Sequence, residues 1–315
     1  MLRVGRGFVE GATLCCPVTL IACSPCWLAV AALPLSRLIS PFFVVTWSTG
    51  FIVARYGLPY AEPATFLVLR FIGVLLFMVP AVLLARVPWP APRMSFHLAV
   101  AGVLLQAGYL GGVWAAIKLG MGAGPAALIV GMQPLLTAIA GQWLGDRPSL
   151  RQWGGLALGF VGVSLVVWNR LGNELTGPSL AWALFALLSI TAGTLYQRRF
   201  CPVFDLRVGS VLQFGAALLV TLPFAFFFET RTVIWSAPFI GALAWSVLAL
   251  SIGSISLLFL LIRRGAASKV ASLMYLTPAT TALMAWLLFG EPLTPLMILG
   301  MAVSAVGVAW AQGKR

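Results

Sequence analysis

Long apolar runs dominate this chain, and short polar segments separate them. About 20 apolar residues are enough for one α-helix to cross the hydrocarbon core of a bilayer. Because lipid offers no partner for an unpaired backbone group, each run is expected to be helical. The pattern predicts ten membrane-spanning helices, near residues 41–57, 65–85, 97–118, 122–144, 152–169, 178–197, 208–228, 237–262, 266–289 and 293–312.

Two stretches resemble each other, which indicates an internal repeat. Residues 122–168 and 265–310 align at an offset of 144 or 145 residues. The matched positions are Pro134 and Pro278, Gly145-Asp146 and Gly290-Glu291, Gly155 and Gly300, and Gly162 and Gly307. Because each half holds five spans, an odd number, the second half must enter the membrane upside down. We therefore predict an all-α integral membrane protein with ten transmembrane helices in a 5+5 inverted repeat, its halves at 41–170 and 178–312.

The composition agrees with a membrane protein. Hydrophobic residues make up 61% of the chain and charged residues 9%, whereas soluble domains carry about 25% charged residues. A net charge of +13 would favour nucleic acid binding in a soluble protein, but here the basic residues lie at the ends of the apolar runs. We interpret the charge as the positive-inside bias of a membrane protein and expect no nucleic-acid partner.

The positions of Lys and Arg predict the orientation of the helices. With the amino terminus inside, 15 of the 20 basic residues fall in cytoplasmic segments and four in external connections, while Arg70 lies within a span. Cytoplasmic loops of membrane proteins are enriched in Lys and Arg. The split therefore predicts a multi-pass protein with both termini in the cytoplasm.

Residues 1–40 form an atypical leader. Three prolines interrupt the apolar run Gly11–Leu35, which makes it a poor helix. Four of the five cysteines gather here, but Cys23-x-x-Cys26 has no His or carboxylate nearby to complete a metal site. We expect the leader to be dispensable or a misassigned start, and a signal-like peptide or an extra anchor is the alternative.

Ionisable groups are scarce within the predicted spans. None of the seven acidic residues lies in the middle of a span, and the single histidine, His97, stands at a helix start. Proton-coupled transporters usually carry a buried acidic or His relay. Uniport, exchange, or coupling through Asp146 or Glu291 therefore stay open.

Arg70 is the exception, because it lies inside the second span. An arginine at mid-helix costs about 3 kcal/mol on insertion scales. One interpretation is that it extends to the outer interface, with Tyr60 or Glu62 as its partner. The other is that it binds an anion or acts as a gate at the outer mouth of a cavity.

Uncharged polar and aromatic side chains within the spans are the remaining candidates for a substrate site. The bilayer penalises polar groups unless they face water or one another. Each one alone is explained by an interhelical hydrogen bond, but the set suggests a polar cavity between the halves. With Arg70 included, the predicted substrate-binding residues are Trp47, Ser48, Arg70, Gln106, Tyr109, Gln133, Tyr196 and Tyr275.

Two prolines at matching positions predict paired hinges. Pro134 and Pro278 each remove a backbone hydrogen bond from the fourth or the ninth span and kink it. Small residues also recur on the fifth and tenth spans, which permits close helix packing within one chain or between the chains of a homodimer. These residues are Gly155, Gly159, Gly162, Gly300 and Ser304.

Several of these stretches resemble the EamA-type members of the drug/metabolite transporter superfamily. The similarity covers residues 40–312 and is carried by TWSTGFIVARYGLPYAEPATFLVLRF (46–71), by LLQAGYLGGVWAAIKLGMGAGPAALIVGMQPLLTAI (104–139) and by the paired endings Gly145-Asp146 and Gly290-Glu291. The family commonly has an arginine at the place of Arg70 and an acidic residue at that of Glu291. Asp146 stands at the matching place in the first half, where the family more usually has Glu. The resemblance implies a carrier of the bacterial inner membrane with a central cavity between its halves.

The leading hypothesis is a secondary transporter that exports or exchanges small metabolites, amino acids or drugs by alternating access. One alternative is a lipid-linked flippase, which needs a lateral opening and a site for anionic headgroups. The other is a scaffold or sensor that transports nothing and needs no polar set within the spans. An enzyme is not expected, since the sequence offers no buried acid pair and no metal cluster. We expect a small-molecule substrate and no cofactor or metal.

Overall fold

The computed structural model describes residues 26–142, 149–170, 176–254, 257 and 277–312. Within these ranges the chain is all-α, and its strand-like pairing is limited to an isolated bridge between Ala61 and Val233. The predicted fold class is thereby confirmed at the level of an all-helical protein. The chain divides into two units, and the packing below concerns the larger one, Ile39–Arg315. Of the predicted leader, residues 1–25 lie outside the described residues, and residues 26–40 belong to the first helix.

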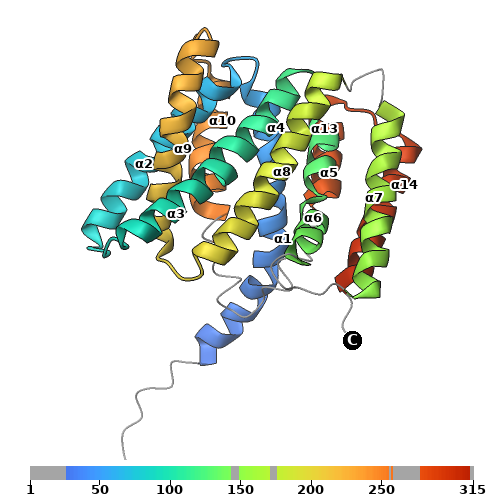
Figure 1. Ribbon diagram of the computed structural model, residues 1–315, viewed down its shortest axis with the longest axis horizontal. Helices are drawn as coiled ribbons and strands as arrows, with labels where there is room; N and C mark the ends of the chain where they lie inside the picture. The colour runs from blue at the N-terminus through green and yellow to red at the C-terminus, as the bar shows by residue number, and fades with distance from the viewer. Residues whose placement is uncertain (1–25, 143–148, 171–175, 255–256, 258–276, 313–315) are drawn as a thin grey trace, which may run out of the picture. The chain divides into compact units, whose positions relative to one another are not determined.

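The helices run side by side across the larger unit (Figure 1). Two of them continue into π-helical segments, named η1 and η3. In chain order the elements are α1 (Cys26–Gly57), α2 (Pro63–Leu84), α3 (Pro92–Gly102), η1 (Val103–Gly108), α4 (Tyr109–Lys118), α5 (Ala123–Val130), α6 (Gln133–Gly141), α7 (Leu150–Arg170), α8 (Gly177–Phe200), α9 (Leu206–Phe228), α10 (Ala237–Trp245), η3 (Ser246–Ser254), α13 (Thr277–Phe289) and α14 (Pro295–Gln312).

Six helical segments of the described chain are long and apolar enough to cross a membrane. Three shorter apolar helices, Trp153–Gly162, Thr277–Phe289 and Pro295–Gly307, lie where the fifth, ninth and tenth spans are predicted. The six long segments are Pro63–Leu84, Pro92–Lys118, Ala123–Gly141, Gly177–Phe200, Leu206–Phe228 and Ala237–Ser254. The number of ten spans and the inversion of the repeat stay predictions.

Helix starts follow local sequence signals. Pro63 begins α2, where the missing N–H costs nothing because the first turn has no partner for it. Thr176 caps α8 in a reciprocal arrangement: its hydroxyl accepts from the Ser179 N–H at 3.3 Å, and the Ser179 hydroxyl accepts from the Thr176 N–H at 3.1 Å. These caps fix where the long apolar helices enter the bundle.

At three of the five matching positions of the two predicted halves, the corresponding helices pack against each other. The partners are α2 with α9, α5 with α13, and α7 with α14. Large aromatic side chains fill the core between them, with Phe66, Phe71, Trp114, Phe214 and Phe239 each at most 1% exposed. In a bilayer, the lipid tails are as apolar as the side chains, so the hydrophobic effect does not drive helices to associate. Dense packing of side chains holds the helices together instead.

The predicted small-residue faces meet between α7 and α14 of the same chain. A Cβ on Gly162 would lie 2.3 Å from the Ser304 hydroxyl, and one on Gly307 would lie 2.7 Å from the Gly155 carbonyl. The Ser304 hydroxyl donates to the Gly159 carbonyl at 3.4 Å. Close helix packing by these residues is therefore confirmed within one chain, while a homodimer stays a prediction.

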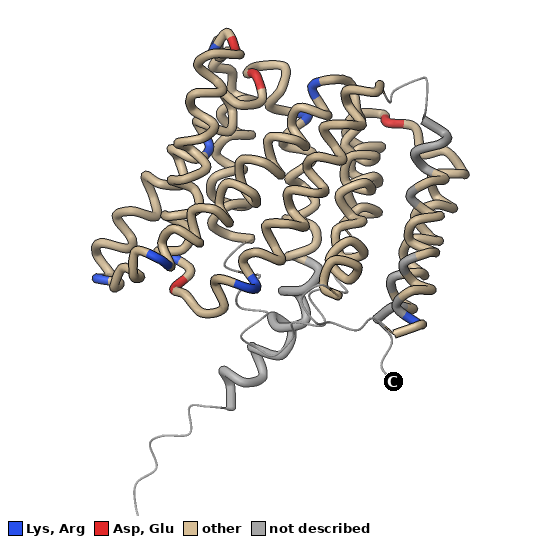
Figure 2. Tube along the Cα trace, viewed as in Figure 1, with Lys and Arg blue, Asp and Glu red and all other residues tan. Residues whose placement is uncertain are grey.

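Charged positions gather at the two ends of the helices and are sparse along their middle (Figure 2). We call the end where α1 finishes and α5 begins, at Gly57 and Ala123, the sealed end. The end where α8 finishes and α9 begins, at Phe200 and Leu206, is the open end. The central cavity described below reaches the open end and stops short of the sealed end.

Candidate functional site

A cavity of about 800 Å³ occupies the middle of the larger unit. Its walls come from α1, α2, η1, α4, α5, α6, α8, α9, η3 and α13. Ligand pockets of this kind typically measure 300–1,000 Å³, so a small metabolite fits inside. Seven of the residues singled out from the sequence line this cavity: Trp47, Arg70, Gln106, Tyr109, Gln133, Pro134 and Pro278.

Both π-helical segments contribute to the cavity wall. An offset of 145 residues carries η1 onto residues 248–253, which lie within η3, and carries Gln106 onto Ser251. Both side chains line the cavity. π-Helical turns inside α-helices are often found at functional sites, because the extra residue shifts the register of the side chains that follow.

Arg70 projects from α2 into this wall and is 6% exposed. Its Nε donates a hydrogen bond to the Ser251 Oγ at 3.1 Å, and that hydroxyl donates to the Ser246 carbonyl at 3.0 Å. Glu62 instead accepts hydrogen bonds from Thr230. The interpretation that Arg70 extends outward to Tyr60 or Glu62 is therefore wrong, and its side chain belongs to the cavity.

Amide and hydroxyl groups form the rest of the polar lining. The Gln133 Nε2 donates to the Thr194 Oγ1 at 3.0 Å, and the Gln213 Nε2 donates to the Gln197 Oε1 at 3.0 Å. The sequence analysis did not single out Thr194 or Gln213. Gln213 is the one amide side chain in the seventh apolar run, a signal that would have found it.

Two predicted substrate residues lie elsewhere. Ser48 is fully buried beside the cavity, where its hydroxyl donates to the Val44 carbonyl at 2.7 Å. The Tyr196 hydroxyl is 2.7 Å from the His97 Nδ1, at the open end. Neither side chain lines the cavity. Tyr275 and Asp146 fall outside the described residues.

The fourth predicted span is broken at the cavity. α5 ends at Val130 and α6 begins at Gln133, one residue before Pro134. Gly131 in the break lies against Pro278, since a Cβ there would be 2.8 Å from the proline Cγ. The structure thus brings the two predicted hinge regions into contact, while hinge motion itself stays a prediction.

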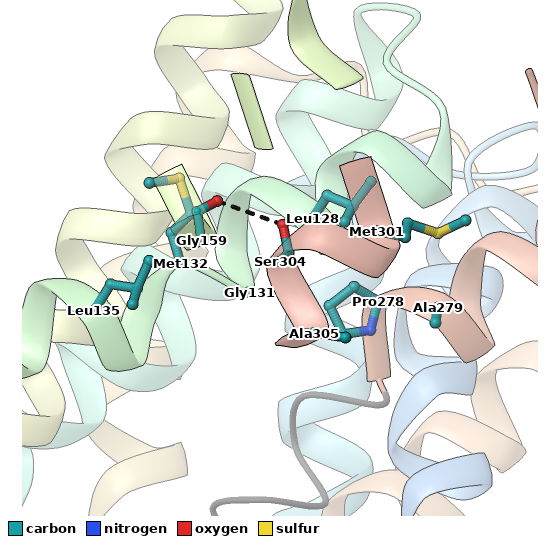
Figure 3. Close-up of a pocket in the computed structure, with 10 residues that line it drawn as sticks. All are labelled: Leu128, Gly131, Met132, Leu135, Gly159, Pro278, Ala279, Met301, Ser304 and Ala305. Carbon is teal, nitrogen blue, oxygen red and sulfur yellow. Dashed lines mark hydrogen bonds between the residues drawn. The ribbon is translucent and has the colours of Figure 1, made fainter. Parts of the chain in front are cut away.

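A small crevice of about 30 Å³ lies behind this break (Figure 3). Leu128, Met132 and Leu135 of the broken span face it from one side, and Met301 and Ser304 of α14 face it from the other. Flexible methionine side chains repack easily into such space.

Glu291 ties three helices together at the sealed end. Its carboxylate accepts from the N–H groups of Ala123 at 3.0 Å and Gly124 at 3.4 Å, at the start of α5. It also pairs with the Arg55 Nη1 at 3.2 Å, near the end of α1. A carboxylate at a helix N-terminus satisfies free N–H groups and the helix dipole. Glu291 itself follows α13 and is 7% exposed.

Two further carboxylates tie α2 to α9 at this end. The Glu229 carboxylate accepts from the N–H groups of Ala64 at 2.8 Å and Thr65 at 2.7 Å. In return, the Glu62 carboxylate accepts from the Thr230 N–H and hydroxyl. Those bonds, led by the hydroxyl, hold the pKa of Glu62 below its usual range. Their contribution to stability is thus present at neutral pH and is lost as the pH falls through that lowered value.

An aromatic layer lies between these ties and the cavity. The rings of Phe66 and Trp114 are 4.2 Å apart, and the Phe239 ring meets Phe66 edge-on at 5.5 Å. The cavity lining from α1 stops at Phe51, and that from the fourth span starts at Ala127. The cavity therefore stops short of the sealed end.

At the open end, the lining continues to the connection between α8 and α9. Arg198, Cys201, Pro202 and Phe204 all belong to it. Burial raises the pKa of the Cys201 thiol, which keeps it protonated and weakly reactive. The cavity thus extends from the middle of the bundle to one end only.

The chain matches a family of known proteins over most of its length. Residues 39–168 and residues 177–311 each match the EamA-like transporter family. The uncharacterized transporter YvbV of Bacillus subtilis is 28% identical over 291 residues, which cover 90% of this chain and 93% of that protein. The uncharacterized inner membrane transporter YedA of Escherichia coli is 26% identical, with 87% and 90% covered.

One further relative carries a functional name, and one solved structure has a similar fold. A protein of Salmonella typhimurium named as a probable amino-acid metabolite efflux pump is 26% identical, with 84% of this chain and 90% of that protein covered. A solved structure described only as "Crystal structure of protein" superposes with a TM-score of 0.63 at 20% identity, covering 87% of this chain and 96% of that one. This last likeness shows the shared fold alone.

Proposed function

The chain belongs to the EamA-like transporter family, and from that premise we propose that it is a secondary carrier that exports or exchanges small metabolites across the bacterial inner membrane. The observation that carries this proposal is the polar cavity that reaches one end of the helices and is closed at the other. A carrier needs such a site, open to one side at a time. The Salmonella relative named as a probable amino-acid metabolite efflux pump supports export of amino-acid-like compounds.

Alternating access follows from an inverted repeat of five plus five spans. Three observations support that architecture: helices at three of the five matching positions pack in pairs, the two π-helical segments correspond at an offset of 145 residues, and the family matches twice. When the two related halves exchange conformations, a cavity that opens to one side of the membrane opens to the other side instead.

The predicted orientation relates the two ends of the cavity to the two sides of the membrane. If both termini lie in the cytoplasm, the open end faces the cytoplasm and the sealed end faces outward. The structure then corresponds to the state that loads substrate from inside. Release requires the ties of Glu291, Glu229 and Glu62 to separate at the sealed end, while the break at Gly131 and the start of α13 bend to close the other side.

Counterflow in proteoliposomes tests this function. Vesicles are loaded in turn with amino acids, cationic drugs, sugars and nucleosides, and protein-dependent exchange of at least one class is expected. No exchange of any class by a well-folded sample, with or without a pH gradient, contradicts the carrier and favours a flippase or a scaffold. A flippase would instead move a fluorescent lipid between leaflets in the same vesicles.

Gln106→Ala is expected to slow exchange about fivefold, since a neutral hydrogen bond to a substrate is worth about 1 kcal/mol. Gln106 lies in η1 and lines the cavity. Gln142→Ala is the matched control, because Gln142 is exposed just beyond α6 and does not line the cavity. Equal initial rates for the two variants would remove Gln106 from the site.

A further inference from the structure

The charges that line the cavity are all of one sign. Arg70 and Arg198 belong to its wall, and among the residues that the structure describes no Asp or Glu does. The four described acidic residues are held at helix ends: Glu62, Glu229 and Glu291 at the sealed end, and Asp205 in front of α9. Inside the cavity, a substrate thus meets the buried Arg70 and no acidic side chain from these ranges.

Arg70 has unused hydrogen-bonding capacity. A guanidinium carries five N–H donors, and the bond to Ser251 engages only Nε. Within the described ranges no carboxylate lies within ion-pair distance of Arg70, although its side chain is nearly fully buried. The Nη donors form the planar fork that binds a carboxylate with two parallel hydrogen bonds. An anion arriving there would relieve the cost of a buried, unpaired charge.

Thr277 provides a second unsatisfied polar group. Its Oγ1 is buried without a hydrogen-bond partner in the described part of the chain, and the residue lines the cavity at the start of α13. Buried polar atoms without partners are rare in proteins and are explained by strain, water or a ligand. A hydroxyl donates readily to a carboxylate oxygen, so an anion bound by Arg70 would also accept a hydrogen bond from Thr277.

The rest of the wall fits an apolar body. Trp47, Phe51, Trp114 and Phe214 line the cavity along with aliphatic side chains. The remaining polar groups are neutral amides and hydroxyls, including Gln106 and Gln133. These accept an ammonium hydrogen bond but offer no opposing charge. A cation without a carboxylate would therefore be repelled by Arg70, and no acidic side chain of the described wall would offset that repulsion.

Resting on the proposed carrier function, we propose that the substrates are small carboxylates with an apolar side chain, anchored by the Arg70 guanidinium with the Thr277 hydroxyl as a further donor. Amines that lack a carboxylate, cationic drugs among them, are rejected. The apolar body lies against the aromatic wall. The carboxylate is the required group, and an α-ammonium is tolerated through the neutral acceptors.

Matched compounds test the requirement directly. Counterflow is measured with leucine and phenylalanine, with their 2-oxo acids, and with their amides, which keep the ammonium group and lose the carboxylate. Exchange is expected for the acids and the 2-oxo acids, and exchange of the amides is expected to be slower by about tenfold or more. Exchange of the amides at rates equal to the acids overturns the proposal.

Three variants locate the anchor. Arg70→Gln is expected to abolish the preference for acids over amides, and Arg70→Lys to keep part of it because the charge stays while the fork is lost. Thr277→Val, which preserves the shape of the side chain, is expected to raise the KM for acids about fivefold. Arg199→Gln is the control, since Arg199 is exposed at the end of α8 and does not line the cavity. Size-exclusion profiles and thermal unfolding show that each variant is folded.

The outcomes separate this inference from the function on which it rests. Exchange of cationic drugs, sugars or nucleosides, with amides as good as acids, overturns the carboxylate anchor and leaves the carrier standing. A preference for acids that survives in folded Arg70→Gln also overturns the anchor. Exchange of no compound class by the folded protein overturns both.

Discussion

Replacing Glu291 with Gln is expected to open the sealed end of the cavity in a large fraction of molecules. The carboxylate holds the first N–H groups of α5 and the Arg55 guanidinium. A hydrogen bond to a charged group is worth about 1.5–3 kcal/mol, whereas the ion pair to partly exposed Arg55 adds less than about 1 kcal/mol. Gln keeps one acceptor oxygen but turns an N–H₂ group toward those donors.

The substitution destabilises the state in which the sealed end is closed by about 2 kcal/mol. The equilibrium between this state and the state in which that end is open therefore shifts about thirtyfold toward the open state. The aromatic layer of Phe66, Trp114 and Phe239 stays intact, so the protein is expected to remain folded. The variant is expected to show the same size-exclusion profile as the parent and a lower fraction of the state described here.

Cysteine labelling measures this shift. A Gly50→Cys reporter, in a background with all five native cysteines changed to Ser, places a thiol in the cavity wall, where an added Cβ meets nothing closer than 4.0 Å. A membrane-impermeant maleimide applied from the side of the sealed end is expected to label Glu291→Gln about ten times faster or more. Asp205→Asn is the control, because Asp205 is also a carboxylate at a helix start but lies at the open end, where it pairs with the exposed Arg207. Equal labelling rates in both variants would show that Glu291 does not hold the seal.

The sequence was sufficient to find part of the polar lining of the cavity, for a physical reason. Polar side chains in apolar runs must face water or one another, so Gln106, Tyr109 and Gln133 stood out and share one cavity. Ser48 satisfies its hydroxyl differently, by bonding to the carbonyl one turn back in its own helix. Composition cannot distinguish a polar side chain that faces a cavity from one that bonds within its own helix, because the difference depends on where the neighbouring helices lie.

Other features left no trace in the hydropathy pattern. A π-helical turn changes the register by one residue without changing the apolar character of the run, so η1 and η3 were not predicted. Glu291 was considered for coupling because it is acidic, whereas in the structure it contacts Arg55 and the start of α5. That role depends on a segment 168 residues away in the chain, a separation that no local pattern encodes.

Gly102→Ala is expected to destabilise the fold strongly. Gly102 ends α3, where the helix lies so close to α9 that an added Cβ would be 2.4 Å from both the Cα and the carbonyl oxygen of Gln213. Those atoms are backbone and cannot rotate away, so the two helices must separate. Overpacking of this kind costs about 1–3 kcal/mol or more, and we expect the upper part of that range because the moved backbone also carries the Gln213 amide of the cavity wall.

Matched glycines distinguish this contact from a general intolerance of substitution. Gly111 in α4 and Gly215 in α9 have no heavy atom within 4 Å of an added Cβ. Since alanine favours helix over glycine by about 0.5–1 kcal/mol, Gly111→Ala and Gly215→Ala are expected to match or slightly exceed the parent in thermal stability in detergent. A Gly102→Ala protein that unfolds at the same temperature as Gly215→Ala would show that α3 and α9 approach less closely than described. Because α9 carries one wall of the cavity and η1 continues directly from α3, any shift at Gly102 also moves Gln106, so the residual folded fraction is expected to lose exchange.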